Sequence, residues 1–390
     1  MRVRKLSILI ALIVITLSTV SVLAQGPETF EQACAISIRS QRPILLEFYR
    51  DGCESCELAA RETESETTVI KALQRVVHLP LNVIEGEGIA LAEKYRPGIY
   101  SPVFILINAE GDVISRWTGY TGANRFIRSL NTALSDMTTL DERIARCKAH
   151  PKALDVQFLA KYYYDTQEFV KARDYYRQLH TLNSPTLDLR YQVFTATAEA
   201  VWNNQLSFDE LLWAADDLID NPATNKQHFG RMAQIVTKVA RRTGDTGRIK
   251  KYLTAGIKST ATLSDDAGVA SHRDLLTDYA LYVLVDTAEA VSVKQRALGD
   301  SWETDPARYF QYAEWCFQRG INLEEAELYV RTATNKASEG KFKAKHLRLL
   351  AKICHALGKT DEAITLGEQA MEQDPSASYF LSKLDKWREN

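Results

Sequence analysis

Two kinds of hydrophobic pattern divide the chain, and the first occupies roughly residues 27–137. In this part, short apolar runs of strand length alternate with stretches in which apolar residues recur at helical spacing. The expected strands are Ile44–Tyr49, Val76–Leu81, Val103–Ile107 and Val113–Trp117, and the expected helices begin near Phe30, Cys53, Ile89 and Gly122. The last two strands are separated by a short turn rich in Asn, Gly and Asp, which predicts a hairpin. Alternating helices and strands, then a hairpin and a closing helix, predict a small α/β domain.

The second pattern begins after Leu140, where strand-like runs stop and helical spacing continues for about 250 residues. Two neighbouring segments are alike at an offset of 37 or 38 residues, one beginning at Tyr312 and the other at Leu350. Each has a small residue where two helices touch, a Gly turn and Ala in the second helix, and in this they resemble tetratricopeptide repeats. An earlier copy begins at Leu159, and the signature is weak across 191–297. We expect an all-α, tetratricopeptide-like helical repeat domain.

The chain begins with a segment typical of a secretory signal peptide. Three basic residues within the first five positions are followed by Leu6–Ala24, which carries no charge and ends in small residues that suit a signal peptidase. Cleavage after Ala24 divides the chain into a signal peptide at 1–24, the α/β domain at 25–137 and the helical domain at 138–390. The alternative is an uncleaved membrane anchor, because 19 uncharged residues approach the ~20 that span a bilayer.

Composition narrows the classes of function. With 45% apolar and 25% charged residues, the chain is neither collagen-like nor broadly disordered. The formal charge is −2, and removal of three basic residues with the leader leaves 45 basic against 50 acidic residues, a charge of −5. Such a surface does not attract nucleic acid, so no nucleic-acid partner is expected. The chain has no Asn-x-Ser/Thr acceptor, and together with the leader this favours a bacterial periplasmic protein over a glycosylated one.

The chemistry of the chain is concentrated in Cys53 and Cys56, which are the only two of six cysteines close together in sequence. At a strand-to-helix junction, a Cys-x-x-Cys motif places the first sulfur at the helix N-terminus, where free N–H groups stabilise a thiolate. The second sulfur can then attack a mixed disulfide, and this exchange needs no bound cofactor. The alternatives are a static disulfide or half of a zinc site. No second Cys-x-x-Cys or His-x-x-x-His occurs, so no metal is expected.

The residues around this motif resemble the thioredoxin superfamily over about 27–135. Glu47, six residues before the motif, falls where thioredoxins carry a buried carboxylate that helps to move the proton of the resolving cysteine. Ser101-Pro102 falls where the family has a cis-proline that faces the active-site sulfurs. The segment 116–121 is most similar to periplasmic thioredoxin domains of electron-relaying disulfide reductases. The resemblance therefore implies a thioredoxin-like fold and a catalytic set made of Cys53, Cys56, Pro102 and Glu47.

The motif departs from the thioredoxin pattern in two places. Gly52 stands where a Trp is usual, which removes part of the surface that docks a partner, and Glu54-Ser55 replaces the usual Gly-Pro. Glu54 should disfavour the adjacent Cys53 thiolate through like-charge repulsion. A less stable thiolate makes a less oxidising couple, so we expect a reductase or isomerase. From the residues alone, a solvated Glu47 and an ordinary trans Pro102 remain alternatives.

Two functional hypotheses follow. In the first, the protein is an exported thiol–disulfide oxidoreductase that acts on a protein disulfide or receives electrons from a thiol protein, while its helical repeats bind a protein partner. In the second, it is a cell-envelope interaction scaffold on a structural thioredoxin-like platform, because about two thirds of the mature chain is helical repeat. A membrane enters either hypothesis only if the leader is uncleaved.

The remaining histidines and cysteines offer no second catalytic site. No His lies near the cysteine pair in sequence, so nucleophilic catalysis by a Cys–His pair has no candidate. Cys316 and Cys354 occupy equivalent positions in neighbouring repeats. The two alternatives for them are buried free thiols and a disulfide between them.

Overall fold

The computed structural model of the chain describes residues 26–98, 101–183, 188–299, 302–375 and 380–389. The expected signal peptide at 1–24 and its cleavage site lie outside these residues. Contacts within the chain group it into two compact units, one ending at Ala214 and the other beginning at Ala215. Within the described ranges, no helix combines the length and the apolar character needed to cross a bilayer.

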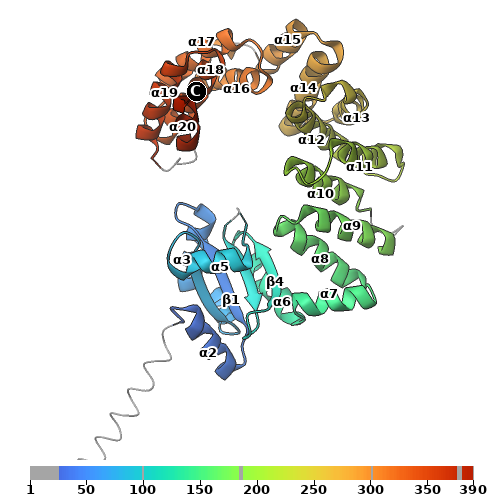
Figure 1. Cartoon of the computed structure of the whole chain (residues 1–390), viewed down its shortest axis with the longest axis vertical. Helices are drawn as coiled ribbons and strands as arrows, with labels where there is room; N and C mark the ends of the chain where they lie inside the picture. Colours follow the sequence, from blue (N-terminus) through green and yellow to red (C-terminus); the bar gives the residue numbers. More distant parts are fainter. Residues whose placement is uncertain (1–25, 99–100, 184–187, 300–301, 376–379, 390) are drawn as a thin grey trace, which may run out of the picture. The chain divides into compact units, whose positions relative to one another are not determined.

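A four-stranded sheet forms the centre of the N-terminal part of the first unit (Figure 1). Its strands are β1 (Ile44–Tyr49), β2 (Val77–Asn82), β3 (Val103–Ile107) and β4 (Val113–Thr118). They lie in the order β2-β1-β3-β4, with β1 and β2 parallel and β3 antiparallel to both β1 and β4. The parallel pair needs a crossover connection, which two helices supply, whereas β3 and β4 form the hairpin predicted from the sequence.

Five helices cover the two faces of this sheet. They are α2 (Phe30–Ser40), α3 (Glu54–Ser65), α4 (Thr67–Leu73), α5 (Gly86–Tyr95) and α6 (Ala123–Ser135). Successive side chains of a strand point to opposite faces, so Ile44, Leu46 and Phe48 join the apolar cluster under α2 and α5. Leu45 joins the other cluster, under α3, α4 and α6. All four side chains are fully buried, which explains why β1 is apolar at nearly every position.

The polar helical stretch after Cys53, which the pattern predicts as one helix, is broken into α3 and α4. Glu66 lies at the break with an extended backbone, φ −83° and ψ 109°. Its carboxylate accepts hydrogen bonds from the backbone N–H and the hydroxyl of Thr68. A side chain that caps the following helix in this way competes with continuation of the preceding one.

From Leu140 onward, every regular element in the described residues is a helix. The α-helices are α7 (Leu140–Ala149), α8 (Ala153–Asp165), α9 (Phe169–Asn183), α10 (Arg190–Trp202), α11 (Phe208–Asp220), α12 (His228–Thr243), α13 (Lys250–Thr260), α14 (Asp266–Tyr279), α15 (Thr287–Ala297), α16 (Pro306–Arg319), α17 (Leu323–Lys336), α18 (Lys341–Ala356), α19 (Thr360–Gln373) and α20 (Leu381–Glu389). Successive helices pack in pairs, such as α8 with α9, α16 with α17 and α18 with α19. The predicted architecture, an α/β domain followed by paired helices, is confirmed.

The two alike segments found in the sequence are the pairs α16–α17 and α18–α19. Gly320 and Gly358 follow the first helix of each pair with φ of 67° and 79°, a left-handed conformation that glycine adopts without strain. Cys316 and Cys354 are fully buried in one apolar cluster, and both are free thiols. Of the two alternatives for these cysteines, the structure has the buried thiols and not the disulfide.

Candidate functional site

Cys53 and Cys56 are joined by a disulfide at the N-terminus of α3, with their Cα atoms 5.2 Å apart. Cys53 is the N-cap of the helix, and its sulfur accepts a hydrogen bond from the backbone N–H of Cys56 at 3.3 Å. Unpaired N–H groups and the helix dipole favour negative charge at this position. The preceding Gly52 has φ 71°, a left-handed conformation that gives a local reason for glycine where thioredoxins carry Trp.

The two sulfur-bearing residues differ in their access to solvent. Cys53 is half-buried, whereas Cys56 is buried at 5% exposure. An incoming thiol or disulfide therefore reaches Cys53 first. This asymmetry suits an attacking Cys53 and a resolving Cys56.

The segment Ser101-Pro102 lies against the first sulfur, and the peptide bond between its two residues is cis. The carbonyl oxygen of Ser101 lies 3.5 Å from Sγ of Cys53. The same oxygen accepts a hydrogen bond from the hydroxyl of Ser55 at 3.0 Å, and that hydroxyl lies 3.4 Å from Sγ of Cys53. The carbonyl of Pro102 in turn accepts a hydrogen bond from the N–H of Gly119 at 2.8 Å. Two distant segments thus meet at one sulfur, and Gly119 holds the second of them in place through Pro102.

Glu47 is a buried residue of β1, at 4% exposure, and so is not the solvated strand residue that the sequence left open. Its Oε2 lies 2.7 Å from Nε2 of His78 on the neighbouring strand β2. The parallel register sets Leu45 opposite His78 and Glu47 opposite Pro80, which places the two polar side chains on one face of the sheet. The side chain of His78 is one-fifth exposed, so it connects the buried carboxylate to solvent.

A pocket of about 450 Å³ lies beside the motif and is lined by Cys56, Glu47 and His78, among others. The structure therefore places all four predicted catalytic residues at the disulfide. Cys53 and Cys56 form it, the Ser101-Pro102 segment lies against Cys53, and Glu47 lines the same pocket as Cys56. Two further residues, Ser55 and His78, were missed by sequence reasoning. Ser55 had only its place inside the motif as a signal, and His78 only its place as a polar residue in an apolar strand run.

Tyr120 ties α3 to the segment that follows β4. Its hydroxyl donates a hydrogen bond to the carboxylate of Glu62 at 2.7 Å. Burial raises the pKa of Tyr120 well above its ordinary value, and the hydrogen bond to Glu62 raises it further. The phenol therefore stays protonated at neutral pH and continues to hold the helix that carries both cysteines.

One cluster in the second unit has the spacing of a metal site. Ligand atoms of Glu327, Cys354 and Glu362 lie within 4.8 Å of one another. Arg331 contacts both carboxylates at 2.6 Å, and Lys359 contacts Glu327 at 2.7 Å. Two cations therefore already compensate the two carboxylates, and this cluster is an ion-pair network between α17 and α19.

The sequence comparisons identify the N-terminal domain. Residues 30–134 match the sequence model of a thioredoxin-like domain family, which confirms the thioredoxin-like domain predicted from the cysteine motif and its surroundings. The match covers just over a quarter of the chain. The comparison with curated proteins finds no match.

Solved structures that are similar to parts of this chain fall into two groups. A thioredoxin from Thermus thermophilus is 22% identical with a TM-score of 0.25, over 27% of this chain and 85% of that one. The C-terminal domain of DsbD from Neisseria meningitidis, in its oxidised form, is 23% identical with a TM-score of 0.24. The match covers 28% of this chain and 99% of that one. A tetratricopeptide repeat protein from Parabacteroides merdae is 12% identical with a TM-score of 0.42. The match covers 68% of this chain and 96% of that one.

Proposed function

We propose that this protein is an exported thiol–disulfide oxidoreductase of the reductase or isomerase type, acting on protein disulfides. The observation that carries the proposal is the Cys53–Cys56 disulfide at a helix N-terminus of a thioredoxin-like domain, with a half-buried first cysteine and a buried second one. The uncharged leader supports export. The paired helices serve to hold a protein partner, because stacked helical repeats offer extended surfaces.

In the first step, the thiolate of Cys53 attacks one sulfur of the substrate disulfide. A bond forms between this sulfur and Cys53, the substrate S–S bond breaks, and the leaving substrate sulfur takes up a proton. The helix N-terminus stabilises the thiolate before the attack. The hydroxyl of Ser55, 3.4 Å from Sγ of Cys53, donates a hydrogen bond to the carbonyl oxygen of Ser101 and holds that segment beside the sulfur. Backbone of the Ser101-Pro102 segment lies beside the reacting sulfur and faces the bound partner.

In the second step, Cys56 resolves the mixed disulfide. Its proton passes to Glu47 and, through His78, to solvent, since these groups line one pocket. The Cys56 thiolate then attacks Sγ of Cys53, which forms the intramolecular disulfide and releases the second substrate sulfur to be protonated as a thiol. Two electrons have moved from the cysteine pair to the substrate disulfide. A thiol protein of lower reduction potential returns the pair to its reduced state.

The reduction potential of the Cys53/Cys56 pair, measured by equilibration with glutathione on the chain from Gln25 onward, tests the proposal together with reduction of insulin disulfides. We expect a reversible couple at or below about −180 mV, the range from disulfide isomerases to thioredoxins, and loss of turnover in Cys53→Ser. A potential near about −120 mV, that of a strong oxidant, would contradict a reductase or isomerase. A pair that does not titrate, or gives no turnover, would contradict an enzyme.

Trapping of a mixed disulfide distinguishes the enzyme from a scaffold. Cys56→Ser should hold a substrate covalently on Cys53, visible as a band that reductant releases on a non-reducing gel. Cys34→Ser, which removes a half-buried free thiol of the same unit, is the matched control and should trap nothing. If the Cys53→Ser/Cys56→Ser variant keeps all partners and the cellular phenotype, the scaffold hypothesis is favoured instead.

A further inference from the structure

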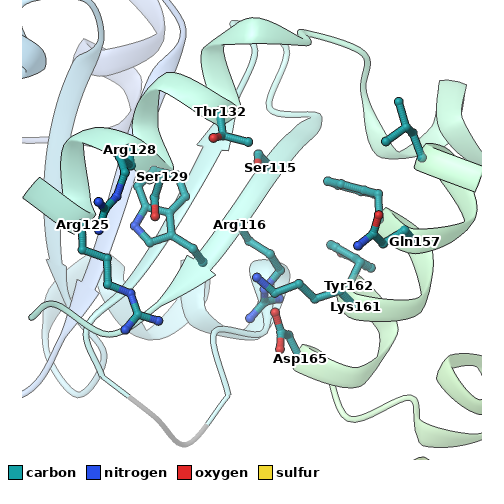
Figure 2. A pocket seen from close by; sticks show the side chains of 13 residues that line it. Ser115, Arg116, Arg125, Arg128, Ser129, Thr132, Gln157, Lys161, Tyr162 and Asp165 are labelled. Atoms are coloured by element: carbon teal, nitrogen blue, oxygen red, sulfur yellow. The ribbon is translucent and has the colours of Figure 1, made fainter. Parts of the chain in front are cut away.

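A second pocket, of about 620 Å³, lies between the sheet edge and the helical region of the first unit (Figure 2). We call it the basic pocket, because four of its lining side chains are cationic and one is acidic. Arg116 comes from β4, Arg125 and Arg128 from α6, and Lys161 and Asp165 from α8. It shares no lining residue with the pocket beside the disulfide.

The positive charge of the basic pocket is largely uncompensated. Arg125, Arg128 and Lys161 are exposed, and across the described ranges no carboxylate forms an ion pair with any of them. Among the described residues that line the pocket, Asp165 is the only acidic one. Four cations against one acid favour an anionic ligand at this position.

Arg116 lies at the centre of the pocket with only 6% of its surface exposed. Its terminal nitrogens donate to the carbonyl oxygens of Arg96 and Pro97 at 3.2 Å, and its guanidinium lies 5.7 Å from the ring centre of Tyr162. Burial lowers the pKa of Arg116, whereas the negative charge of Asp165 raises it. Within the described residues, the two side chains do not form a contact ion pair. A buried cation whose direct partners are carbonyl groups is costly, and a counter-charge reduces that cost.

Two N–H groups in the lining have no acceptor within the part of the chain that the structure describes. They are Nε of Arg116 and Nε1 of Trp117, on consecutive residues of β4. Both groups are donors, and both side chains are more than nine-tenths buried. The strand register places these two side chains on opposite faces of the sheet, with Arg116 opposite Ile105 and Trp117 opposite Phe104 in the apolar cluster under α6. Only the unpaired donor of Arg116 therefore agrees with the sign of the charge in the pocket.

From these features we propose that the basic pocket binds an acidic peptide segment of a protein partner. The cations come from three elements on two sides of the pocket, which suits several carboxylates along a chain better than one compact anion such as phosphate. Leu154 and Phe158 of α8 also line the pocket, and Leu154 is 78% exposed, so an apolar surface is available to side chains between the carboxylates. The volume is within the usual range of ligand pockets. Because binding needs no thiol chemistry, this proposal stands or falls separately from the exchange reaction.

Fluorescence anisotropy of a labelled peptide of alternating Glu and Leu residues tests the proposal, with the matched Gln–Leu peptide as its neutral control. We expect the acidic peptide to bind with an affinity that falls as salt rises, and the neutral peptide not to bind. Failure of the acidic peptide to bind would overturn the proposal. Inorganic phosphate and citrate are added as competitors, and equal binding of either would show that the site takes a small anion and not a peptide.

Charge reversal locates the binding. Arg125→Glu/Arg128→Glu should weaken peptide binding at least about tenfold, the effect of losing charge-assisted hydrogen bonds. Arg39→Glu/Lys71→Glu makes the same change in net charge at exposed helical positions outside the pocket, and should leave the affinity unchanged. Equal losses in both variants would indicate non-specific attraction, and no loss in the first would also refute the site. Circular dichroism confirms that both variants fold, as expected for exposed side chains.

Discussion

The thiolate of Cys53 is subject to opposing influences from its immediate neighbours. The N-terminus of α3 favours it, and the exposed carboxylate of Glu54 in the first helical turn opposes it. Because the reduction potential rises as the reduced form becomes more stable, under the proposed function the balance between these groups sets the direction of electron transfer. Glu54 is the member of this set that can be removed without disturbing a buried contact.

Glu54→Gln should stabilise the Cys53 thiolate, because it removes a like charge beside the sulfur. We expect the thiolate fraction at pH 7 to rise about threefold and the couple to become more oxidising. Ultraviolet absorbance of the thiolate and glutathione equilibration measure the two effects. Glu57→Gln removes another exposed acid of the same helical turn and is the control. An equal effect of Glu57→Gln would show that net charge, and not adjacency to the sulfur, is responsible.

Glu47→Gln should slow the second step of exchange and leave the first unchanged. The amide fills the same space but cannot accept the proton of Cys56, so resolution of a preformed mixed disulfide should fall about tenfold or more. His78→Asn should slow the same step by interrupting the path to solvent. The release rate of the second substrate thiol and the rate of mixed-disulfide formation are measured separately. Equal slowing of both steps would mean that Glu47 only supports the fold.

Among the helical elements, the network around Glu327 joins α17 to α19. Burial raises the pKa of Glu327, but hydrogen bonds from Lys359 and Arg331 lower it more, so the net pKa lies below the ordinary 4.5. A carboxylate with a lower pKa in the folded state than in the unfolded chain stabilises the fold at pH values above 4.5. That contribution is lost as the pH falls through the folded-state pKa.

Glu327→Gln should therefore lower the free energy of unfolding of the second unit by about 1–2 kcal/mol at neutral pH. This is less than for a fully buried ion pair, because Arg331 and Lys359 are partly exposed to solvent. The difference from the wild type should shrink as the pH falls below 4.5. Urea denaturation at a series of pH values measures both. Glu368→Gln breaks an exposed pair with Arg388 and should cost less than about 0.5 kcal/mol. A pH-independent loss in Glu327→Gln would contradict the electrostatic explanation.

For the whole molecule, the signal peptide predicted from the sequence leads to an expectation about where the protein is found. On expression of the full chain in bacteria, we expect the intact mass to correspond to a protein that begins at Gln25 and fractionates with the periplasm, because small residues precede the predicted cleavage site. Ala24→Leu enlarges the residue before the cleaved bond and should retain the leader. A full-length mass in the membrane fraction of the wild type would show an uncleaved anchor.

The division of the molecule into two compact units also affects how its stability is measured. The first unit contains the thioredoxin-like domain and the first helices after it, and the second contains the repeats around Cys316 and Cys354. Chains of this kind do not unfold in a single two-state step as a rule. The effects of Glu47→Gln and Glu327→Gln should consequently be assigned to separate units by probes placed in each.

Features that depend on neighbours within a turn or a strand were determined by the sequence itself. The strand and helix pattern, the position of Cys53 and Cys56 at one helix end and the glycines after α16 and α18 all follow from local spacing and backbone conformation. The break at Glu66 was missed, because capping of a second helix competes with a continuous helical pattern.

Only the tertiary structure decided which distant residues share a site. His78 contacts Glu47 across 31 positions because β1 and β2 pair in parallel in one register, and the carbonyl of Ser101 lies beside Cys53 across 48 positions. The basic pocket likewise exists because α8 packs near β4 and α6, which no local pattern predicts. Local sequence specifies which way a backbone turns, but the register of strands and the packing of helices depend on the burial of apolar surface throughout the domain.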